Sequence, residues 1–304
     1  MEYYKKALSI LFLILFLFNG CKNDNLEQKG SPSYITSIEE WQKDRITNLK
    51  SADGWLNLVG LYWLKPGDNK FGTDLGNDIV FPRGMAPGVI GTFSLNDGVV
   101  SVNIIPGVRV ICNGQPVSEM TLQDDMSGNP TVLELGYLRW FIIKRGDMYG
   151  VRVRDLNAPM VRDFKGIETF PINEDWRITA KLSPNNPPKI ITVQSVIGTS
   201  EHDTVNASLV FSIKGKEYRL DPLVEGNQFF IIFADETNGE ETYGAGRFLY
   251  ADQPDAEGNV ILDFNKAYNP PCTFTEYATC PLPPKQNYLP IKITAGEKKY
   301  KESD

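Results

Sequence analysis

Histidine is nearly absent from this chain, because His202 is the single one among 304 residues. A Cys2His2 zinc site is therefore impossible, and a serine–histidine–aspartate triad would have to use His202, for which no nucleophile-elbow motif occurs elsewhere. His202 lies between Glu201 and Asp203, which indicates a solvated loop position, with metal ligation as the alternative. The sequence predicts no metal site and no cofactor.

Basic runs and two common motifs are also missing. The chain has 31 Lys and Arg against 38 Asp and Glu, a net charge of −7, and no basic segment, which argues against nucleic-acid binding. Gly244-Ala245-Gly246 is followed by neither a third glycine nor a helical pattern, so it is not a dinucleotide-binding fingerprint. The absence of a Cys-x-x-Cys motif argues against a redox role.

Long apolar runs are limited to one, from Ala7 to Phe18, which follows Lys5 and Lys6. A membrane span needs about 20 apolar residues, so residues 1–20 are expected to form a signal peptide. The run ends at Gly20-Cys21, which resembles a bacterial lipobox and thereby implies cleavage and attachment of lipid, such as palmitate, to Cys21. A plain secretory signal is the alternative. Because no other segment is apolar enough to span a bilayer, membrane attachment would depend on the lipid.

The next segment, residues 21–35, is polar and contains Gly30 and Pro32, which is typical of a flexible tether. Lys22-Asn23-Asp24 resembles the export tags of surface lipoproteins of the Bacteroidetes type. Together these features predict a cell-envelope location, as an outer-membrane lipoprotein that faces either the periplasm or the cell surface.

The four cysteines have different expected roles. Cys21 would carry the lipid, and Cys112, in the apolar pattern of residues 108–112, is expected to be a buried free thiol. Cys272 and Cys280 lie close together in the sequence and are disulfide candidates in an oxidising envelope. Such a bond would contribute roughly 2–3 kcal/mol by the chain-entropy model. Free structural thiols and functional thiols remain as alternatives.

One amphipathic helix is expected near the N-terminus. Ser37-Ile38-Glu39-Glu40 has the form of a capping box, and apolar residues then follow at helical spacing before Gly54. The apolar positions are Ile38, Trp41, Ile46 and Leu49, which gives a helix of about three turns.

Everything after this helix has the pattern of short strands separated by turn signals, such as Asn238-Gly239. The expected strands are residues 55–64, 78–81, 99–105, 108–112, 137–144, 148–154, 176–182, 189–196, 207–213, 228–233, 242–250, 260–264 and 288–294. The predicted fold class is therefore all-β, with sandwich or barrel architecture and one N-terminal amphipathic helix.

Two units are expected, because residues 162–175 interrupt the strand pattern. Residues 36–165 would hold the helix and a β-sandwich, and residues 166–304 a C-terminal β unit. The first unit resembles a forkhead-associated sandwich in outline, through matches at Leu64–Gly67, Phe71-Gly72, Asp78-Ile79 and Asn113-Gly114. Thr73 stands where that family has its phosphate-gripping arginine, and the Ser-x-x-His element is absent, so the resemblance implies the fold but no phosphopeptide recognition.

The C-terminal third has a dense mixture of Asn, Tyr, Pro and Cys that neither a strand nor a linker requires. Its most distinctive segments are residues 235–248, 263–272 and 277–284. These segments resemble the signature of domain of unknown function 1684, a family of bacterial and archaeal proteins. Weaker matches, such as Gly54-Trp55-Leu56, Arg145-Gly146-Asp147 and Arg152–Asp155, extend the resemblance back to about Trp41. The family implies no reaction.

Arg247, directly after the two glycines of the Gly-Ala-Gly segment, is a candidate to hold a carboxylate or phosphate in a bidentate grip. The alternative is a strand bulge in which Arg247 pairs with Asp235 or Glu241. Antiparallel pairing of residues 242–250 and 260–264 across one turn would bring Arg247 near Asp263.

A second cluster offers oriented donors and acceptors for a ligand. Its candidate ligand-binding residues are Asp263, Asn265, Tyr268, Asn269 and Cys272. The alternative is that the two asparagines satisfy backbone groups of the Pro-rich loop.

The sequence therefore predicts a lipid-anchored envelope protein that acts as a ligand-binding or interaction module, with a small molecule, a glycan or a peptide as its partner. The alternative is an envelope hydrolase that uses Asp235, Glu241 or Glu297 together with Arg247. Glu297 more simply ends a strand and pairs with a neighbouring lysine.

Overall fold

The computed structural model describes residues 26–300, and the predicted signal peptide and the predicted lipidation site, Cys21, lie outside this range. Helix α1 (Pro32–Lys50) begins before the predicted Ser37, because Ser31 caps it and Pro32 occupies its first turn. The Ser31 hydroxyl accepts a hydrogen bond from the Tyr34 amide at 3.3 Å, whereas the Ser37 hydroxyl donates to the Tyr34 carbonyl at 2.7 Å. The capping box at Ser37 was thus wrong, and residues 32–35 are helical instead of part of a tether.

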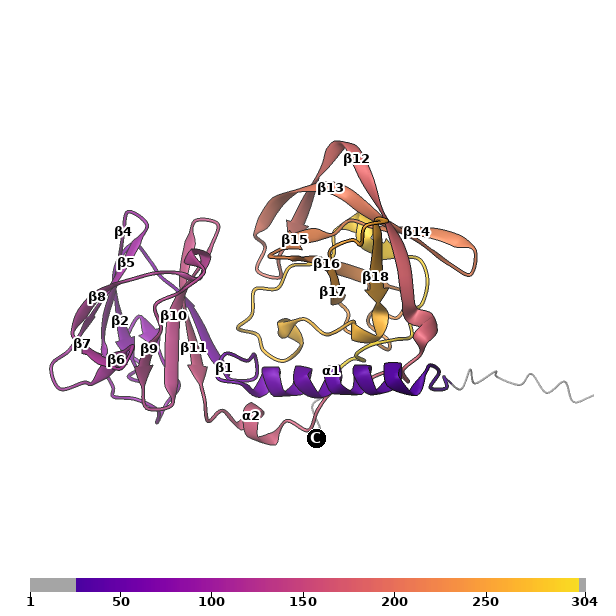
Figure 1. Cartoon of the computed structure of the whole chain (residues 1–304). Coiled ribbons are helices and arrows are strands. Elements are labelled where there is room, and N and C mark those ends of the chain that lie inside the picture. The colour runs from indigo at the N-terminus through magenta and orange to yellow at the C-terminus, as the bar shows by residue number, and fades with distance from the viewer. Residues whose placement is uncertain (1–25, 301–304) are drawn as a thin grey trace, which may run out of the picture.

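The N-terminal unit is a sandwich of a five-stranded sheet, ordered β3-β2-β4-β5-β8, and a six-stranded sheet, ordered β1-β11-β10-β9-β6-β7 (Figure 1). Its strands are β1 (Leu58–Trp63), β2 (Gly67–Gly72), β3 (Ile79–Val80), β4 (Gly91–Asn96), β5 (Val99–Ile104), β6 (Val110–Cys112), β7 (Gln115–Val117), β8 (Glu119–Leu122), β9 (Leu133–Leu135), β10 (Leu138–Arg145) and β11 (Met148–Asp155), with the 3-10 helix η1 (Asp125–Ser127) before β9. Trp140 lies in the core between the sheets and makes edge-on contacts with Phe71 and Phe81. Alternate residues of β11, such as Val151 and Val153, point into this core.

Helix α2 (Pro159–Asp163) and an extended segment lead to the C-terminal unit, in which two further sheets enclose a second core. One sheet has the order β14-β13-β12-β18, and in the other β15, β16 and β17 are joined by β19, which is parallel to β16. The strands are β12 (Arg177–Gln194), β13 (Ser200–Ile213), β14 (Lys216–Leu220), β15 (Leu223–Glu225), β16 (Gln228–Asp235), β17 (Arg247–Asp252), β18 (Asn259–Asp263) and β19 (Tyr288–Leu289), and the 3-10 helices are η2 (Glu174–Trp176), η3 (Phe264–Lys266), η4 (Pro271–Thr273) and η5 (Lys285–Asn287). The predicted all-β class with one N-terminal helix is confirmed.

The predicted pairing of the two strands on either side of residues 253–258 is wrong. Strand β17 pairs with β16, and β18 pairs with β12, so the two strands belong to different sheets. The other edge of β17 is used by an irregular segment, because Phe248 and Tyr268 exchange both backbone hydrogen bonds at 2.9 Å. A polar turn therefore connects the two sheets of the unit, not two strands of one sheet.

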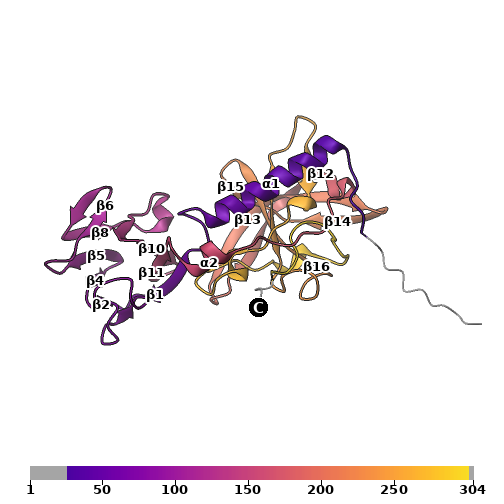
Figure 2. The ribbon, with the colours of Figure 1, turned by 90° about the horizontal axis from the view of Figure 1, so that it is seen from below.

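Helix α1 packs along the C-terminal unit, although the sequence grouped it with residues 36–165 (Figures 1 and 2). The Tyr34 hydroxyl donates to Asp263 at 2.8 Å, and the Trp41 ring lies 6.5 Å from the Tyr268 ring. These contacts join the start of the folded chain to segments more than 200 residues away. No helix among residues 26–300 is long and apolar enough to cross a membrane.

Candidate functional site

Arg247 is sealed inside the C-terminal unit. Its side chain has no exposed surface, Nη2 lies 2.7 Å from Oδ2 of the equally buried Asp235, and the guanidinium also donates to the carbonyls of Ala295 and Ile293. Gly246 has φ +92° and leaves no room for a Cβ atom, which would lie 2.4 Å from a Pro283 carbon. The expectation of an open ligand site at Arg247 is therefore wrong, and the paired alternative holds, because neighbouring segments close over the guanidinium.

Asn265 and Asn269 are also buried and act on the backbone. Asn265 accepts from the Asn173 amide at 2.9 Å and donates to the Asn173 carbonyl at 2.8 Å, while Asn269 donates to the Lys298 carbonyl at 2.8 Å. The Asn269 amide in turn donates to Glu297 at 2.6 Å. In these irregular segments no sheet ladder pairs the backbone amide and carbonyl groups, and the two asparagines supply hydrogen bonds to them instead. The asparagines therefore have a structural role and are not ligand contacts.

Cys272 and Cys280 form a disulfide, with Cα atoms 6.2 Å apart. The bond closes the loop that carries Thr279, and it removes Cys272 from the set of free ligand-binding groups. Cys112 is a buried free thiol, as expected, and burial raises its pKa. His202 lies in strand β13, although the sequence indicated a loop. Its exposed ring hydrogen-bonds the Thr192 hydroxyl at 3.1 Å.

Tyr268 is the predicted site residue that reaches open space most directly. Its ring is parallel to that of Tyr250, with centroids 6.3 Å apart, and the Arg45 guanidinium lies 4.5 Å from the ring centroid. Burial raises the pKa of the Tyr268 hydroxyl. Tyr268 and Tyr250 contribute to two cavities, and one of them, of about 370 Å³, also includes Asp263.

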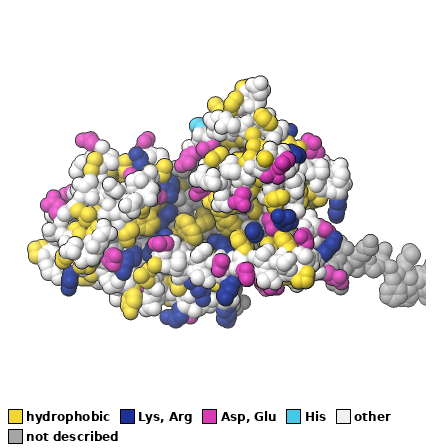
Figure 3. All heavy atoms as spheres, in the orientation of Figure 1, with side chains coloured by type: hydrophobic (Ala, Val, Ile, Leu, Met, Phe, Trp, Pro, Cys, Tyr) yellow, Lys and Arg dark blue, Asp and Glu magenta, His cyan; other side chains and the backbone are white. Residues whose placement is uncertain are grey.

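The other cavity lies between the two β units and has a volume of about 430 Å³. We call it the interdomain cleft. Its lining residues are Arg45, Trp55, Arg145, Glu225, Phe230, Phe248, Tyr250, Tyr268, Pro271, Thr279, Cys280 and Pro281. Figure 3 shows a hollow between the units with apolar side chains at its floor and Lys or Arg side chains along the edge of the N-terminal unit.

Strand β10 contributes the cation Arg145 to the wall of this cleft, and the neighbouring strand β11 carries two further arginines. Because side chains alternate along a strand, the core positions Val151 and Val153 leave Arg152 and Arg154 on the opposite sheet face. Arg145, at the end of β10, binds Asp125 at 2.8 Å and donates through Nε to the Thr279 hydroxyl at 3.0 Å. The two units therefore meet through a contact between an arginine and a threonine.

Arg152 has an unusual environment for a charged side chain. It is only 3 % exposed and is not itself a lining residue of the cleft. The one hydrogen bond of its side chain within residues 26–300 is a long one of 3.4 Å, from Nη2 to the hydroxyl of the lining residue Thr279. Its Nε has no partner in the part of the chain described, and its guanidinium lies 5.6 Å from the centroid of the Trp55 ring. Burial, followed by the charge of Arg145, lowers the pKa of Arg152 to about 10, so the group is still a cation at neutral pH.

Sequence reasoning did not assign Trp55, Arg145, Arg152 or Thr279 to a site. One signal was present, because Arg152 and Arg154 alternate with valines in β11, which marks a sheet face that presents charge. The pattern does not reveal that a second unit covers this face, since that depends on the packing of residues 271–281.

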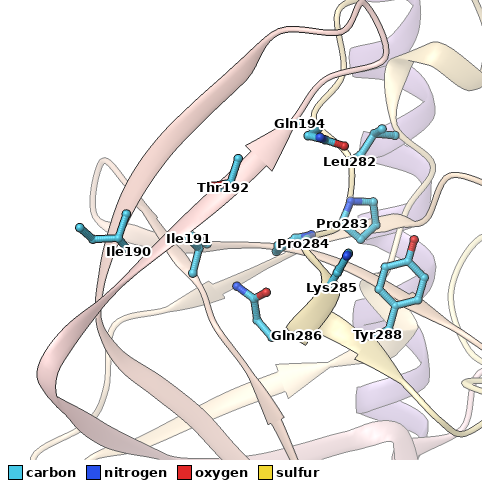
Figure 4. Close-up of a pocket in the computed structure, with 10 residues that line it drawn as sticks. All are labelled: Ile190, Ile191, Thr192, Gln194, Leu282, Pro283, Pro284, Lys285, Gln286 and Tyr288. Atoms are coloured by element: carbon cyan, nitrogen blue, oxygen red, sulfur yellow. The ribbon is translucent and has the colours of Figure 1, made fainter.

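A larger groove of about 640 Å³ lies on the C-terminal unit, between β12 and the segment that carries Pro283, Pro284 and Lys285 (Figure 4). Its wall includes Ile190, which is 75 % exposed, and Lys285 is its one charged side chain. Because charges and aromatic rings converge in the interdomain cleft and not in this groove, we regard the cleft as the candidate functional site despite its smaller volume.

Comparison with known proteins finds a family that is similar to the C-terminal unit. Residues 162–298 match the model of the family described as "Protein of unknown function (DUF1684)", which confirms the resemblance for this part of the chain. The segments with Trp55, Arg145 and Arg152 lie outside the match. No curated protein matches the chain.

One similar solved structure is the solution NMR structure of the uncharacterized protein from gene locus rrnAC0354 of Haloarcula marismortui. It is 28 % identical, with a TM-score of 0.39, and the alignment covers 48 % of this chain and 83 % of that one.

Proposed function

We propose that the protein is a lipid-anchored protein of the cell envelope that binds a small organic ligand in the interdomain cleft. One observation supports this most directly: both β units and helix α1 contribute side chains to a cavity of about 430 Å³. Its aromatic members are Trp55, Phe230, Phe248, Tyr250 and Tyr268. Apolar aromatic walls with a few converging polar groups, at the meeting point of two domains, are the usual composition of small-molecule sites.

Binding is better supported than hydrolysis. Among the described residues that line the cleft, Glu225 is the one carboxylate, and it accepts a hydrogen bond from the Tyr250 hydroxyl at 2.6 Å. Of the three carboxylates that the hydrolase alternative would use, Asp235 and Glu297 are buried and paired with Arg247 and Arg45. The third, Glu241, pairs with Lys292 at 3.3 Å and does not line the cleft. A carboxylate that is sealed from solvent has no access to substrate, so the geometry favours a ligand-binding module.

The cleft is tested by filling it. In the chain from residue 22 onward, Thr279→Trp places a large ring in the cavity, and we expect it to abolish binding of cleft ligands. Saturation-transfer NMR with a library of aromatic acids, aromatic alcohols, disaccharides and dipeptides provides the measurement. Library members that bind the unsubstituted protein should lose their signal with this variant.

The matched control is Thr192→Trp, which adds the same ring to the groove of Figure 4. We expect it to leave binding unchanged. Ligands that bind equally well to Thr279→Trp, or an absence of any binder to the unsubstituted protein, would contradict the proposed site.

Anchoring rests on the apolar run that ends at Gly20-Cys21. With Cys21→Ser in the full chain, we expect loss of labelling by a clickable fatty acid and release of the protein from membranes, because no acceptor thiol remains for the lipid. Labelling that persists on this variant would show that the lipid, if any, is attached elsewhere.

A further inference from the structure

We propose that Arg152 and Arg145, together with the Thr279 hydroxyl, form the receptor for an oxyanion of the ligand, a carboxylate or a phosphate group. This inference rests on the proposed function and specifies the chemistry of the cleft ligand. It assigns the acidic group to the wall of the N-terminal unit and the apolar body to the aromatic rings.

The first support is that Arg152 is buried without a carboxylate in contact, although the charge of the more distant Asp125 acts on it. Within residues 26–300 no carboxylate lies within 4.0 Å of it, whereas Arg247, equally buried, has Asp235 and two carbonyls. Arg154, on the same sheet face, donates to the Gly54 carbonyl and to Asn57 at 2.7 Å. Taking an ion out of water is costly unless partners replace the lost hydration. Arg152 is the exception among these three arginines, and an oxyanion would supply the missing acceptors.

The second support is the convergence of two cations on one neutral oxygen. Arg145 Nε and Arg152 Nη2 lie 3.0 and 3.4 Å from the same Thr279 hydroxyl oxygen. Asp125 binds Arg145 on its Nη1, and it is the one carboxylate in this group. Two guanidinium groups held so close repel each other, and an anion between them would relieve this repulsion and form charge-assisted hydrogen bonds.

The third support is the position of the rings. Trp55 lies against both Arg152, at 5.6 Å, and Arg154, at 6.0 Å, and the same ring lines the cleft. Tyr250 and Tyr268, from the C-terminal unit, also line it. A ligand with an acidic group and a flat or apolar body would therefore contact both units at once, and its binding would stabilise their arrangement.

The test compares three probes that share a phenyl ring: the anions phenyl phosphate and benzoate, and the neutral benzyl alcohol. Isothermal titration calorimetry and thermal unfolding are measured on the chain from residue 22 onward. We expect the two anions to bind more tightly than the alcohol, and Arg152→Met to weaken anion binding at least tenfold. The tighter of the two anions identifies the group as phosphate or carboxylate.

Three controls make the result specific. Arg139→Met removes an arginine of β10 that is already paired with Glu134 at 2.9 Å, and it should leave anion affinity unchanged. Without ligand, Arg152→Met should unfold at the same or a higher temperature, because it removes a buried charge that has no carboxylate partner within residues 26–300. Arg152→Lys keeps the charge but loses the planar guanidinium group that can donate two parallel hydrogen bonds, so it should bind anions with intermediate affinity. This variant replaces Arg152→Met in the test if the methionine variant does not fold.

The possible failures are distinct. If benzyl alcohol binds as tightly as benzoate, and both Arg152 variants bind like the unsubstituted protein, the oxyanion receptor is wrong while the cleft site stands. A methionine variant that is less stable yet binds anions normally overturns it as well, because Arg152 is then structural. If Thr279→Trp fails to displace any probe, the proposed function itself is wrong.

Discussion

Replacing Arg247 with methionine is expected to destabilise the protein by about 3–5 kcal/mol, because it leaves the Asp235 carboxylate buried without its counter-charge. Both side chains have no exposed surface, and they lie 2.7 Å apart. The carbonyls of Ala295 and Ile293 would lose their donor in the same step. Urea denaturation of the chain from residue 22 onward measures the loss.

A double-variant cycle separates the pair from simple packing. Asp235→Asn removes the negative charge, and Arg247→Met with Asp235→Asn should be clearly less destabilised than the sum of the two single variants, by more than about 0.5 kcal/mol. A loss below about 1 kcal/mol for Arg247→Met, within the range of ordinary surface changes and mild substitutions, would show that the segment around Gly246 is not a structural centre.

Replacing Arg45 with methionine is expected to cost about 3 kcal/mol, since it removes the partner of another buried carboxylate. Arg45 Nε lies 3.1 Å from Glu297, whose side chain is 3 % exposed, and Nη2 donates to the Asn269 carbonyl at 2.9 Å. The guanidinium also covers the Tyr268 ring. The variant therefore weakens the attachment of helix α1 to the C-terminal unit.

This loss should depend on pH. Burial already raises the pKa of Glu297 above its ordinary 4.5 in spite of Arg45, and removal of Arg45 raises it further. The folded state then binds the proton more tightly than the unfolded state, so stability is highest below about pH 4.5 and falls as pH rises through the folded-state pKa. The deficit of Arg45→Met should be larger at pH 8 than at pH 5.

Two further variants serve as controls. Lys43→Met, at an exposed position of the same helix, should change stability little at either pH. Adding Glu297→Gln to Arg45→Met should remove most of the pH dependence of the deficit, because the carboxyl group that Arg45 pairs with is then absent. A deficit that is the same at pH 5 and pH 8 would rule out Glu297 as its origin.

The fold class followed from the sequence because strand alternation and turn residues are local signals. Element boundaries were less certain, as the start of α1 shows. Both Ser31-Pro32 and Ser37-Ile38-Glu39-Glu40 are good N-terminal signals, and the earlier one is used. Its helix then extends along the C-terminal unit, where Tyr34 reaches Asp263. That contact spans 229 residues, so no local pattern could have revealed it.

The site was harder to predict, because the sequence around an arginine does not show whether its side chain is buried or exposed. Arg247 and Arg152 are both buried, and they differ only in what surrounds them: Asp235 and two carbonyls for the first, one threonine hydroxyl for the second. These partners come from distant segments. Most residues of the distinctive C-terminal segments stabilise the C-terminal unit, whereas Tyr268 and Thr279 from these segments line the cleft.

The central claim is that the interdomain cleft binds a small ligand with an acidic group. A crystallographic fragment screen on the chain from residue 22 onward tests it most directly, with aromatic acids and their neutral analogues in equal numbers. We expect fragments to gather between Trp55 and Tyr268, with carboxylate or phosphate oxygens within hydrogen-bonding distance of Arg152 and Arg145. Fragments that gather in the groove of Figure 4 and leave the cleft empty would contradict the account.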